Sequence, residues 1–373
     1  VTIRVMAGEY QEDLPLTVPS NVSVIGEDMR NTIITPDTGT QSSDVFLLNG
    51  ESTVQNLTIK GFYSPGYAFR FAPNAVVSTR SPYIQNVTVI TQGTPITVTA
   101  SSTFSVNSQE THPRGITFNN DGTKMFIVGE IGDDVNEYTL STGFDLSSIV
   151  TFVDSFAVTQ CPNPTAVKFN ADGTKMFVTG TNNDNVHQYA LTTGFDVSSA
   201  SFTQTLVTTV DSDNFGLDFK PDGTKMYITG NQNNKIYEYN LSSAFDISSA
   251  TFNQDLTLTA IDFEPFGIEW STDGTRLFIV GTRGNGVDEF AVGTPYDIST
   301  LTHIGFYSIG GNPSGIHISP DGTKMFIIGN QSDTVKSYDL SVSYRIKVPT
   351  DDPRGFAQGD AGKGALVDGA SVT

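Results

Sequence analysis

The sequence predicts an all-β protein in which a five-bladed β-propeller is inserted into a fragmentary right-handed parallel β-helix. Three observations lead to this prediction: a unit of short apolar runs recurs five times, the flanking segments hold other short strands between turn residues, and no long segment has a helical pattern. The predicted boundaries place the first part of the β-helix at residues 1–96, the propeller at 97–342 and a second, truncated part of the β-helix at 343–373.

An Asp-Gly dipeptide marks each copy of the repeat. The five aspartates are spaced 51, 50, 51 and 48 residues apart: Asp121, Asp172, Asp222, Asp273 and Asp321. A short apolar run precedes each dipeptide, as at residues 115–118, and an apolar strand follows it, as at residues 123–129. Asp-Gly between two such runs predicts a hairpin, because glycine readily adopts the positive φ that the turn requires.

Two further strands complete each copy, and the first of these ends in an aromatic residue such as Tyr138. Four strands form a sheet with two apolar faces, and one such sheet cannot bury both of them. Copies arranged around an axis bury these faces against one another, which is the architecture of a β-propeller. The last copy lacks a fourth strand after Tyr338, and we expect residues 99–108 to supply it and close the ring.

The segment before the propeller has another texture, with very short strands separated by Gly, Asn, Pro and Asp. Residues 54–59 and 84–89 share one pattern thirty positions apart, with Asn56 and Asn86 at the same place in each. This spacing predicts stacked coils of a parallel β-helix in which asparagine side chains form a ladder. An ordinary β-sandwich is the alternative. Residues 343–373 have the same texture and are predicted to continue the coils.

The charge balance excludes several classes of partner. The chain carries 40 Asp and Glu against 20 Lys and Arg, a formal net charge of −20. Binding to nucleic acid or to an anionic membrane surface needs clustered basic residues, so we expect neither. The one lysine or arginine per copy, such as Lys124, is expected to be solvated. No apolar run is long enough to span a bilayer, so no membrane insertion is expected.

The composition also argues against cofactors. One cysteine and four histidines predict neither an internal disulfide nor a zinc site, so we expect no metal. The loops between the second and third strands are rich in Asn and Asp, at residues 130–134, 181–185, 231–235, 282–286 and 330–334. These residues commonly form turns, and bound Ca²⁺ is the alternative explanation for them.

Candidate site residues lie where each innermost strand begins, because one polar position per copy would form a ring around the axis: His112, Asn163, Asp213, Glu264 and Asn312. Two positions further come Arg114, Thr165, Phe215, Phe266 and Ser314. We expect these residues to line a central pocket for a sugar or a cation. The alternative is that they cap strand ends beside a hydrated channel.

Asp213 and Glu264 fall on neighbouring copies and are the candidates for a catalytic pair. Two carboxylates can hydrolyse a glycoside, one as the acid and the other as the base or nucleophile. The copies are nearly identical, however, which favours a binding or spacer module over an enzyme. Catalysis is left open at this stage.

The flanking segments resemble a known family. They contain Gly-Glu-Tyr at 8–10, Leu-Pro-Leu-Thr-Val-Pro at 14–19, Val-Ser-Val-Ile-Gly at 22–26, Arg-Ser-Pro-Tyr-Ile-Gln-Asn-Val-Thr at 80–88 and Asp-Pro-Arg-Gly at 352–355. These stretches resemble the β-helix of virion structural and tail-fibre proteins from marine cyanophage myoviruses. The resemblance implies a homotrimer formed through the β-helix. It also implies that the other virion proteins are partners and that the protein is part of the virion.

The first predicted function is therefore that of a phage tail fibre or baseplate appendage. Its propeller would recognise a receptor or glycan on the host surface, or serve as a spacer. A polysaccharide depolymerase acting on the same glycans is one alternative. A secreted, extracellular bacterial adhesin or carbohydrate-binding module is the other, because the propeller repeats resemble generic repeats of secreted and phage proteins.

Overall fold

The computed structural model describes residues 1–36, 44–49, 51–60, 68–71, 83–90, 96–182, 184–258, 264–281, 285–329 and 333–346. The chain divides into two units, and the second of them spans Ile96–Lys347. All regular structure in the described residues is β-strand, apart from three short 3₁₀ helices, so the all-β prediction is confirmed. No helix in these residues is long and apolar enough to cross a membrane.

The predicted second part of the β-helix, residues 343–373, lies outside the described residues from position 347 onward. The described residues 343–346 belong to the unit that contains the propeller.

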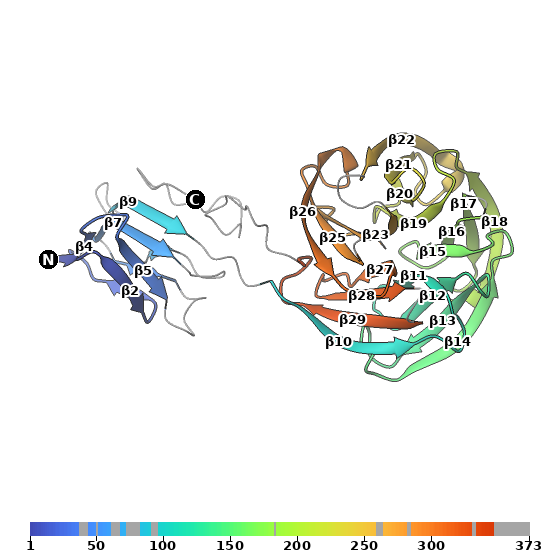
Figure 1. Ribbon diagram of the computed structural model, residues 1–373, viewed down its shortest axis with the longest axis horizontal. Helices are drawn as coiled ribbons and strands as arrows, with labels where there is room; N and C mark the ends of the chain where they lie inside the picture. Colours follow the sequence, from blue (N-terminus) through green and yellow to red (C-terminus); the bar gives the residue numbers. More distant parts are fainter. Residues whose placement is uncertain are drawn as a thin grey trace. The chain divides into compact units, whose positions relative to one another are not determined.

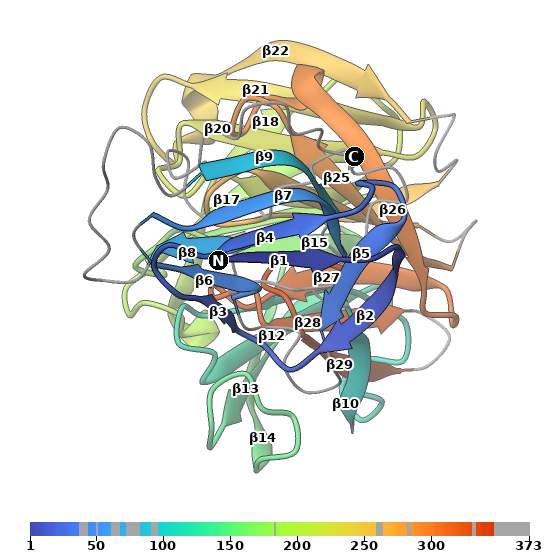
Figure 2. The same ribbon diagram turned by 90° about the vertical axis from the view of Figure 1, so that its left-hand side faces the viewer.

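The first unit consists of parallel strands. These are β1 (Thr2–Val5), β2 (Gly8–Glu12), β3 (Leu16–Val18), β4 (Ser23–Gly26), β5 (Thr32–Pro36), β6 (Phe46–Leu48), β7 (Thr53–Lys60), β8 (Phe69–Phe71) and β9 (Tyr83–Ile90). β1, β4, β7 and β9 pair in register, β2 and β5 pair beside them, and β3, β6 and β8 form a second sheet. Every strand pairing in the described residues of this unit is parallel, so the stacked coils of a β-helix are observed and the β-sandwich alternative is wrong (Figure 2). The right hand of the coil stays a prediction.

Asn56 and Asn86 occupy the same corner of successive coils. Both have a positive φ, and the Asn86 side-chain amide donates a 3.1 Å hydrogen bond to Asn56 Oδ1. The preceding glutamines repeat the arrangement, with Gln55 Nε2 3.2 Å from Gln85 Oε1. The predicted asparagine ladder is therefore present.

The second unit is a ring of five four-stranded antiparallel sheets (Figure 1). Blade 1 comprises β11 (Pro113–Phe118), β12 (Lys124–Gly129), β13 (Asp134–Leu140) and β14 (Val150–Ala157). Blade 2 comprises β15 (Pro164–Phe169), β16 (Lys175–Gly180), β17 (Asn185–Leu191) and β18 (Ala200–Val207). Blade 3 comprises β19 (Asn214–Phe219), β20 (Lys225–Gly230), β21 (Lys235–Leu241) and β22 (Ala250–Thr257).

Blade 4 comprises β23 (Pro265–Trp270), β24 (Arg276–Gly281), β25 (Gly286–Val292) and β26 (Leu301–Ser308). Blade 5 comprises β27 (Pro313–Ile318), β28 (Lys324–Gly329), β29 (Thr334–Leu340) and β10 (Val98–Ser105). The 3₁₀ helices η1 (Val197–Ser199), η2 (Ile247–Ser249) and η3 (Ile298–Thr300) precede the outer strands of blades 2, 3 and 4.

β10 closes the ring, as predicted from the missing fourth strand. It precedes blade 1 in sequence but pairs with β29 of the last blade, with Val98 opposite Leu340 and Ser105 opposite Thr334. The inner strands β11, β15, β19, β23 and β27 each contact the next around the axis, and β27 contacts β11. Apolar clusters lie between successive blades, for example Phe126 of blade 1 with Val167 and Met176 of blade 2. The core is therefore distributed around the ring.

The Asp-Gly turn and a later aromatic residue explain why the repeat is so regular. Asp121 accepts hydrogen bonds from the Thr123 backbone and hydroxyl at 3.0 and 2.6 Å. Gly122 has a φ of 72° and lies under the ring of Phe144, which occupies the space that a side chain would need. The same contact joins each later turn glycine to Phe195, Phe245, Tyr296 or Tyr344.

Candidate functional site

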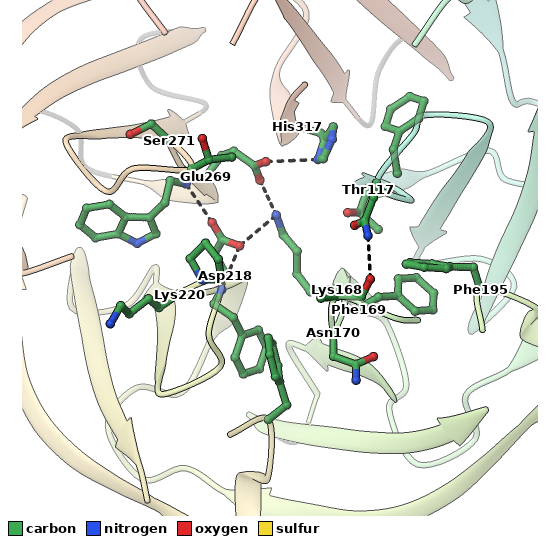
Figure 3. Close-up of a pocket in the computed structure, with 18 residues that line it drawn as sticks. Thr117, Lys168, Phe169, Asn170, Phe195, Asp218, Lys220, Glu269, Ser271 and His317 are labelled. Atoms are coloured by element: carbon green, nitrogen blue, oxygen red, sulfur yellow. Dashed lines mark hydrogen bonds and ion pairs between the residues drawn. The ribbon is translucent and has the colours of Figure 1, made fainter. Parts of the chain in front are cut away.

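The inner strands place a ring of five different polar residues at the propeller axis. Each residue comes directly before the last residue of its strand: Thr117, Lys168, Asp218, Glu269 and His317. All five are at least nine-tenths buried. They line a cavity of about 210 Å³, which Figure 3 shows in close-up. Alternation along each strand gives every blade one side chain at this level.

A layer of small residues lies two positions earlier in the same strands: Gly115, Ala166, Gly216, Gly267 and Gly315. A Cβ on Gly115 would lie 2.6 Å from the Thr165 carbonyl oxygen of the next blade, and one on Gly315 would lie 2.6 Å from that of Arg114. The glycines therefore let the inner strands approach closely. The space at this level is about 10 Å³, so the layer forms a floor beneath the polar ring.

Lys168 joins two carboxylates across the axis. Its ammonium group forms an ion pair with Asp218 at 3.2 Å and a second, shorter one with Glu269. The peptide N–H groups of Phe219 and Trp270 donate to Asp218 at 2.9 and 2.8 Å, which holds this carboxylate in place. An ammonium group has three N–H donors, so these two pairs leave one donor over.

His317 completes the cluster. Its Nδ1 lies 3.2 Å from Glu269 Oε1, close enough for an ion pair if the ring is protonated. The angle does not meet hydrogen-bond geometry, however, and neither ring nitrogen has a hydrogen-bond partner in the described part of the chain. A buried imidazole without partners is unusual, because buried polar atoms are normally hydrogen-bonded. Nε2 is therefore available to a ligand, while Nδ1 faces Glu269.

Burial and mutual charge set the protonation states of the cluster. Burial raises the pKa of Asp218, Lys168 opposes this rise and Glu269 adds to it, so that the pKa of Asp218 is raised to about 6. Burial acts in the same direction on Glu269, but Lys168 and His317 outweigh it and lower its pKa. Burial lowers the pKa of Lys168, but the two carboxylates outweigh it and raise that pKa. At neutral pH Glu269 is thus ionised and Lys168 protonated.

Aromatic side chains also line the cavity. Phe118, Phe169, Phe219 and Trp270 directly follow the polar ring in sequence and line the cavity together with Phe195 and Phe245. Lys220 is the second lysine of the lining, and its ammonium group lies 2.7 Å from Asp222. The site therefore combines apolar walls with a few polar groups at its base, as small-molecule sites usually do.

The residues expected to line an axial pocket lie at the opposite ends of the inner strands. There the Arg114 guanidinium carbon lies 5.8 Å from the centre of the Phe266 ring. The rings of Phe266 and Phe215 pack edge to face, with their centres 4.2 Å apart. Arg114 also forms a 2.7 Å ion pair with Glu130. These side chains pack against one another and are therefore not part of the cavity of about 210 Å³.

The strand-entry residues are engaged through both backbone and side-chain groups, and the His112 ring lies 3.3 Å from the Thr111 hydroxyl. The backbone N–H groups of His112, Asn163 and Asn312 bond Glu110, Asp133 and Asn285 at 2.7, 2.8 and 3.2 Å. The Asp213 side chain accepts a 2.5 Å bond from Gln232. Glu264 also has an interaction partner. These contacts fit the capping interpretation of the strand entries.

The polar ring was not predicted from the sequence, because residues 115–118 and their counterparts resemble short apolar runs. The sequence did contain one indication of the ring, because the position before the last residue of each inner strand varies while the rest of the repeat changes little. Between apolar neighbours, this position holds Thr, Lys, Asp, Glu and His in turn. Charged residues in the middle of apolar strands are rare unless they are paired.

No group of three His, Cys, Asp or Glu residues within the described ranges is arranged to hold a metal ion. Parts of the Asn/Asp-rich loops, residues 183, 282–284 and 330–332, lie outside those ranges. Calcium binding in these loops stays an untested prediction.

One family model matches part of the chain. A family model described as Lactonase, 7-bladed beta-propeller matches residues 159–344, just under half of the chain. This stretch covers blades 2–4 and three of the four strands of blade 5. The ring has five blades and not seven, so the similarity concerns the repeat unit. No match was found among curated proteins.

Solved structures of low identity also align with more than half of the chain. A functionally unknown protein from Desulfotomaculum acetoxidans is 15% identical with a TM-score of 0.38, and the alignment covers 58% of this chain and 62% of that one, less than two thirds of its length. A candidate 6-phosphogluconolactonase from Bacteroides uniformis is 18% identical, with a TM-score of 0.42 and coverage of 63% and 68%. A second candidate 6-phosphogluconolactonase, from Bacteroides fragilis, is 14% identical, with a TM-score of 0.42 and coverage of 61% and 80%.

The family match corrects two predictions. The resemblance to phage virion and tail-fibre proteins is wrong, because the repeats match a lactonase family and no comparison supports a virion protein. The functions built on it or beside it, namely a tail fibre or baseplate appendage, a polysaccharide depolymerase and an adhesin or carbohydrate-binding module, are overturned by the same match. The β-propeller itself stands.

Proposed function

We propose that the axial cavity is the active site of a hydrolase that opens the ring of a carbohydrate lactone. The observation that carries the proposal is the buried chain of Lys168, Glu269 and His317, in which the imidazole has no hydrogen-bond partner within the described residues. The match of residues 159–344 to the lactonase family supports the choice of a lactone.

In this mechanism His317 acts as the general base. A water molecule bound to one ring nitrogen gives up a proton as its oxygen attacks the lactone carbonyl carbon. Glu269 Oε1, 3.2 Å from Nδ1, stabilises the imidazolium that forms. Lys168 keeps Glu269 ionised for this task by lowering its pKa.

Lys168 also provides electrostatic stabilisation of the transition state. Attack by water places negative charge on the former carbonyl oxygen, and the third N–H of the Lys168 ammonium can donate to it. The bond between the carbonyl carbon and the ring oxygen then breaks. The imidazolium returns its proton to the departing ring oxygen, which leaves a hydroxy acid and a neutral histidine.

The experiment is a pH-stat assay of glucono-δ-lactone opening, corrected for the spontaneous reaction. The wild-type protein should accelerate acid release, and His317→Gln and Glu269→Gln should each reduce kcat/KM by roughly 10²- to 10⁴-fold.

The matched control is His303→Gln. His303 also faces a carboxylate, Asp288, at 2.7 Å, but it lies on the outer strand β26 and does not line the cavity. This variant should keep wild-type activity. Full activity in His317→Gln, or a wild-type rate no greater than the spontaneous rate, would refute the proposal.

A further inference from the structure

The cationic groups of the cavity are already neutralised by carboxylates of the same chain. From this we infer, resting on the proposed hydrolase, that the pocket selects an uncharged, polyhydroxylated ring, so that its substrate is an unphosphorylated sugar lactone. Both lysines of the lining are paired with carboxylates, the net charge opposes anions, and the polar groups without partners suit hydroxyls.

Lys168, at the base of the cavity, keeps one N–H donor for the lactone oxygen, but its charge is already balanced and cannot offset the two charges of a phosphoryl group as well. It pairs with both Asp218 and Glu269, so the three groups together carry one excess negative charge when both acids are ionised. His317 adds no uncompensated cation, because it faces Glu269 at 3.2 Å whether or not it is protonated.

Lys220, at the wall of the cavity, is engaged as well. Its ammonium group lies 2.7 Å from Asp222 and 5.7 Å above the centre of the Tyr296 ring. Lys168, Lys220 and His317 are the only residues with cationic side chains in the described lining. A phosphate site normally uses unpaired Arg or Lys groups or several converging peptide N–H groups, so the described lining does not offer a binding site for a phosphoryl group.

The electrostatic field of the molecule acts in the same direction. The chain carries a formal net charge of −20, and the carboxylates of Asp218 and Glu269 lie at the base of the cavity. A dianionic substrate would meet like charges in a partly desolvated site, whereas an uncharged ring pays no such penalty.

The remaining polar groups are suited to hydroxyls. His317 Nε2 has no hydrogen-bond partner in the described residues, and Thr117 adds a hydroxyl to the lining (Figure 3). Asn170 and Ser271 also line the cavity, but their side chains bond the backbone N–H groups of Lys175 and Arg276 at 2.8 and 2.9 Å. The aromatic lining supplies flat apolar faces for the C–H face of a sugar ring.

The kinetic experiment compares glucono-δ-lactone with its 6-phosphorylated form under identical conditions. We expect kcat/KM to favour the unphosphorylated lactone by roughly 100-fold, the size of a like-charge penalty. Equal or faster opening of the phosphorylated lactone would overturn the inference and leave the hydrolase proposal intact.

A binding experiment decides the inference even if neither lactone is opened, a result that would refute the hydrolase proposal. Trp270 lines the cavity and is the only tryptophan of the chain, so its fluorescence reports directly on the occupied site. Titration with glucose should change the emission, and glucose 6-phosphate should need at least a 10-fold higher concentration. A response to the phosphorylated sugar at equal or lower concentration, or no response to either sugar, would overturn the inference.

A variant tests the cause of the selectivity. Asp222→Asn removes the carboxylate that neutralises Lys220 and should narrow the preference between the two sugars several-fold. The matched control is Asp172→Asn, the same turn position in blade 2, where Asn170 stands in place of Lys220. This control should leave the preference unchanged. An equal change in both variants would show that the turn, and not the freed lysine, causes the effect, which would contradict the electrostatic argument.

Discussion

Lys168 and Glu269 are 101 residues apart in the sequence, and their side chains form an ion pair at the propeller axis. The pair links blade 2 to blade 4, which are not neighbours in the ring. Asp218 of blade 3, which lies between them, contacts the same ammonium group. A residue of one blade is thereby coupled to two others through a group that is almost completely buried. The first prediction concerns this coupling.

Replacing Lys168 by Met should destabilise the protein by about 3–5 kcal/mol, because it leaves two buried carboxylates without their cation. The loss should become smaller as the pH is lowered toward 4, since protonation removes the uncompensated charges. Urea unfolding at several pH values measures both effects.

A double-mutant cycle provides the control for Lys168. In the Glu269→Gln background, Lys168→Met should lower the free energy of unfolding by at least about 1 kcal/mol less than it does in the wild type. The reason is that only one buried carboxylate, and not two, then loses its cation. Strictly additive effects would show that the pair does not interact as described.

The second prediction concerns the repeat lysines, which were expected to be solvated but link neighbouring blades. Lys124 forms a 2.6 Å ion pair with the buried Glu137 of its own blade and donates a 2.6 Å hydrogen bond to the Phe195 carbonyl of blade 2. Glu137 in turn accepts from the Val197 backbone of blade 2 at 3.0 Å. Lys225 and Glu238 repeat the arrangement toward blade 4.

Lys124→Met should therefore lower the free energy of unfolding by about 2 kcal/mol, the usual size of a hydrogen bond to a charged group. The matched control is Lys235→Met, which removes the more exposed pair with Asp255 and should cost less than about 1 kcal/mol. Equal losses in the two variants, measured by urea unfolding, would argue against a special role for the link between blades.

The third prediction concerns acid stability, which the Asp-Gly turns should limit. Hydrogen bonds from Thr123 and Thr174 lower the pKa of Asp121 and Asp172, and the pKa of Asp222 is lowered to about 2. Burial raises the pKa of Asp222, but Lys220 and Thr224 outweigh it. A carboxylate with a lowered pKa in the folded state stabilises that state above its unfolded pKa of 3.8, and this contribution is lost as the pH falls through the folded pKa.

Asp218 has the opposite sign, because its folded pKa is raised to about 6 and its contribution falls as the pH rises from about 4 to 6. The urea midpoint should therefore drop steeply only below about pH 4. Asp121→Asn, which keeps one acceptor oxygen for Thr123, should make this drop shallower. A midpoint that stays constant down to pH 2.5 would contradict the assignment.

The fourth prediction concerns the first unit, where Gly26 lies at the coil corner that Asn56 and Asn86 occupy in later coils. A Cβ at Gly26 would collide with the Asn56 carbonyl oxygen, which belongs to backbone and cannot move aside cheaply. Gly26→Ala should destabilise the first unit by more than about 1 kcal/mol and leave the propeller transition unchanged. Limited proteolysis and scanning calorimetry can separate the two units. Unchanged resistance of residues 1–60 to protease would count against the predicted clash.

Much of the fold could be predicted, because the repeated turns mark where the strands of each blade begin and end. The five Asp-Gly turns located the blades, and the missing strand after Tyr338 identified β10 as the closing strand. The matching Asn56 and Asn86 predicted the parallel coils.

The candidate site was harder to predict, because strand entry and strand end are equally plausible positions for an axial ring when only the sequence is known. Arg114, Phe215 and Phe266 were expected to line a pocket but pack against one another. Lys168 and His317 lie in runs that look apolar in the sequence. Their burial could not be predicted, because a charged group is buried only beside partners that the sequence does not identify.

The sequence by itself determined the all-β class, the number of blades and the way the ring closes, since each follows from a periodic pattern of turns and apolar runs. Only the tertiary structure decided which end of the axis carries the chemistry. The physical reason is that Thr117, Lys168, Asp218, Glu269 and His317 come from five separate blades, and their burial is tolerable only because closure of the ring brings opposite charges together above a floor of glycines.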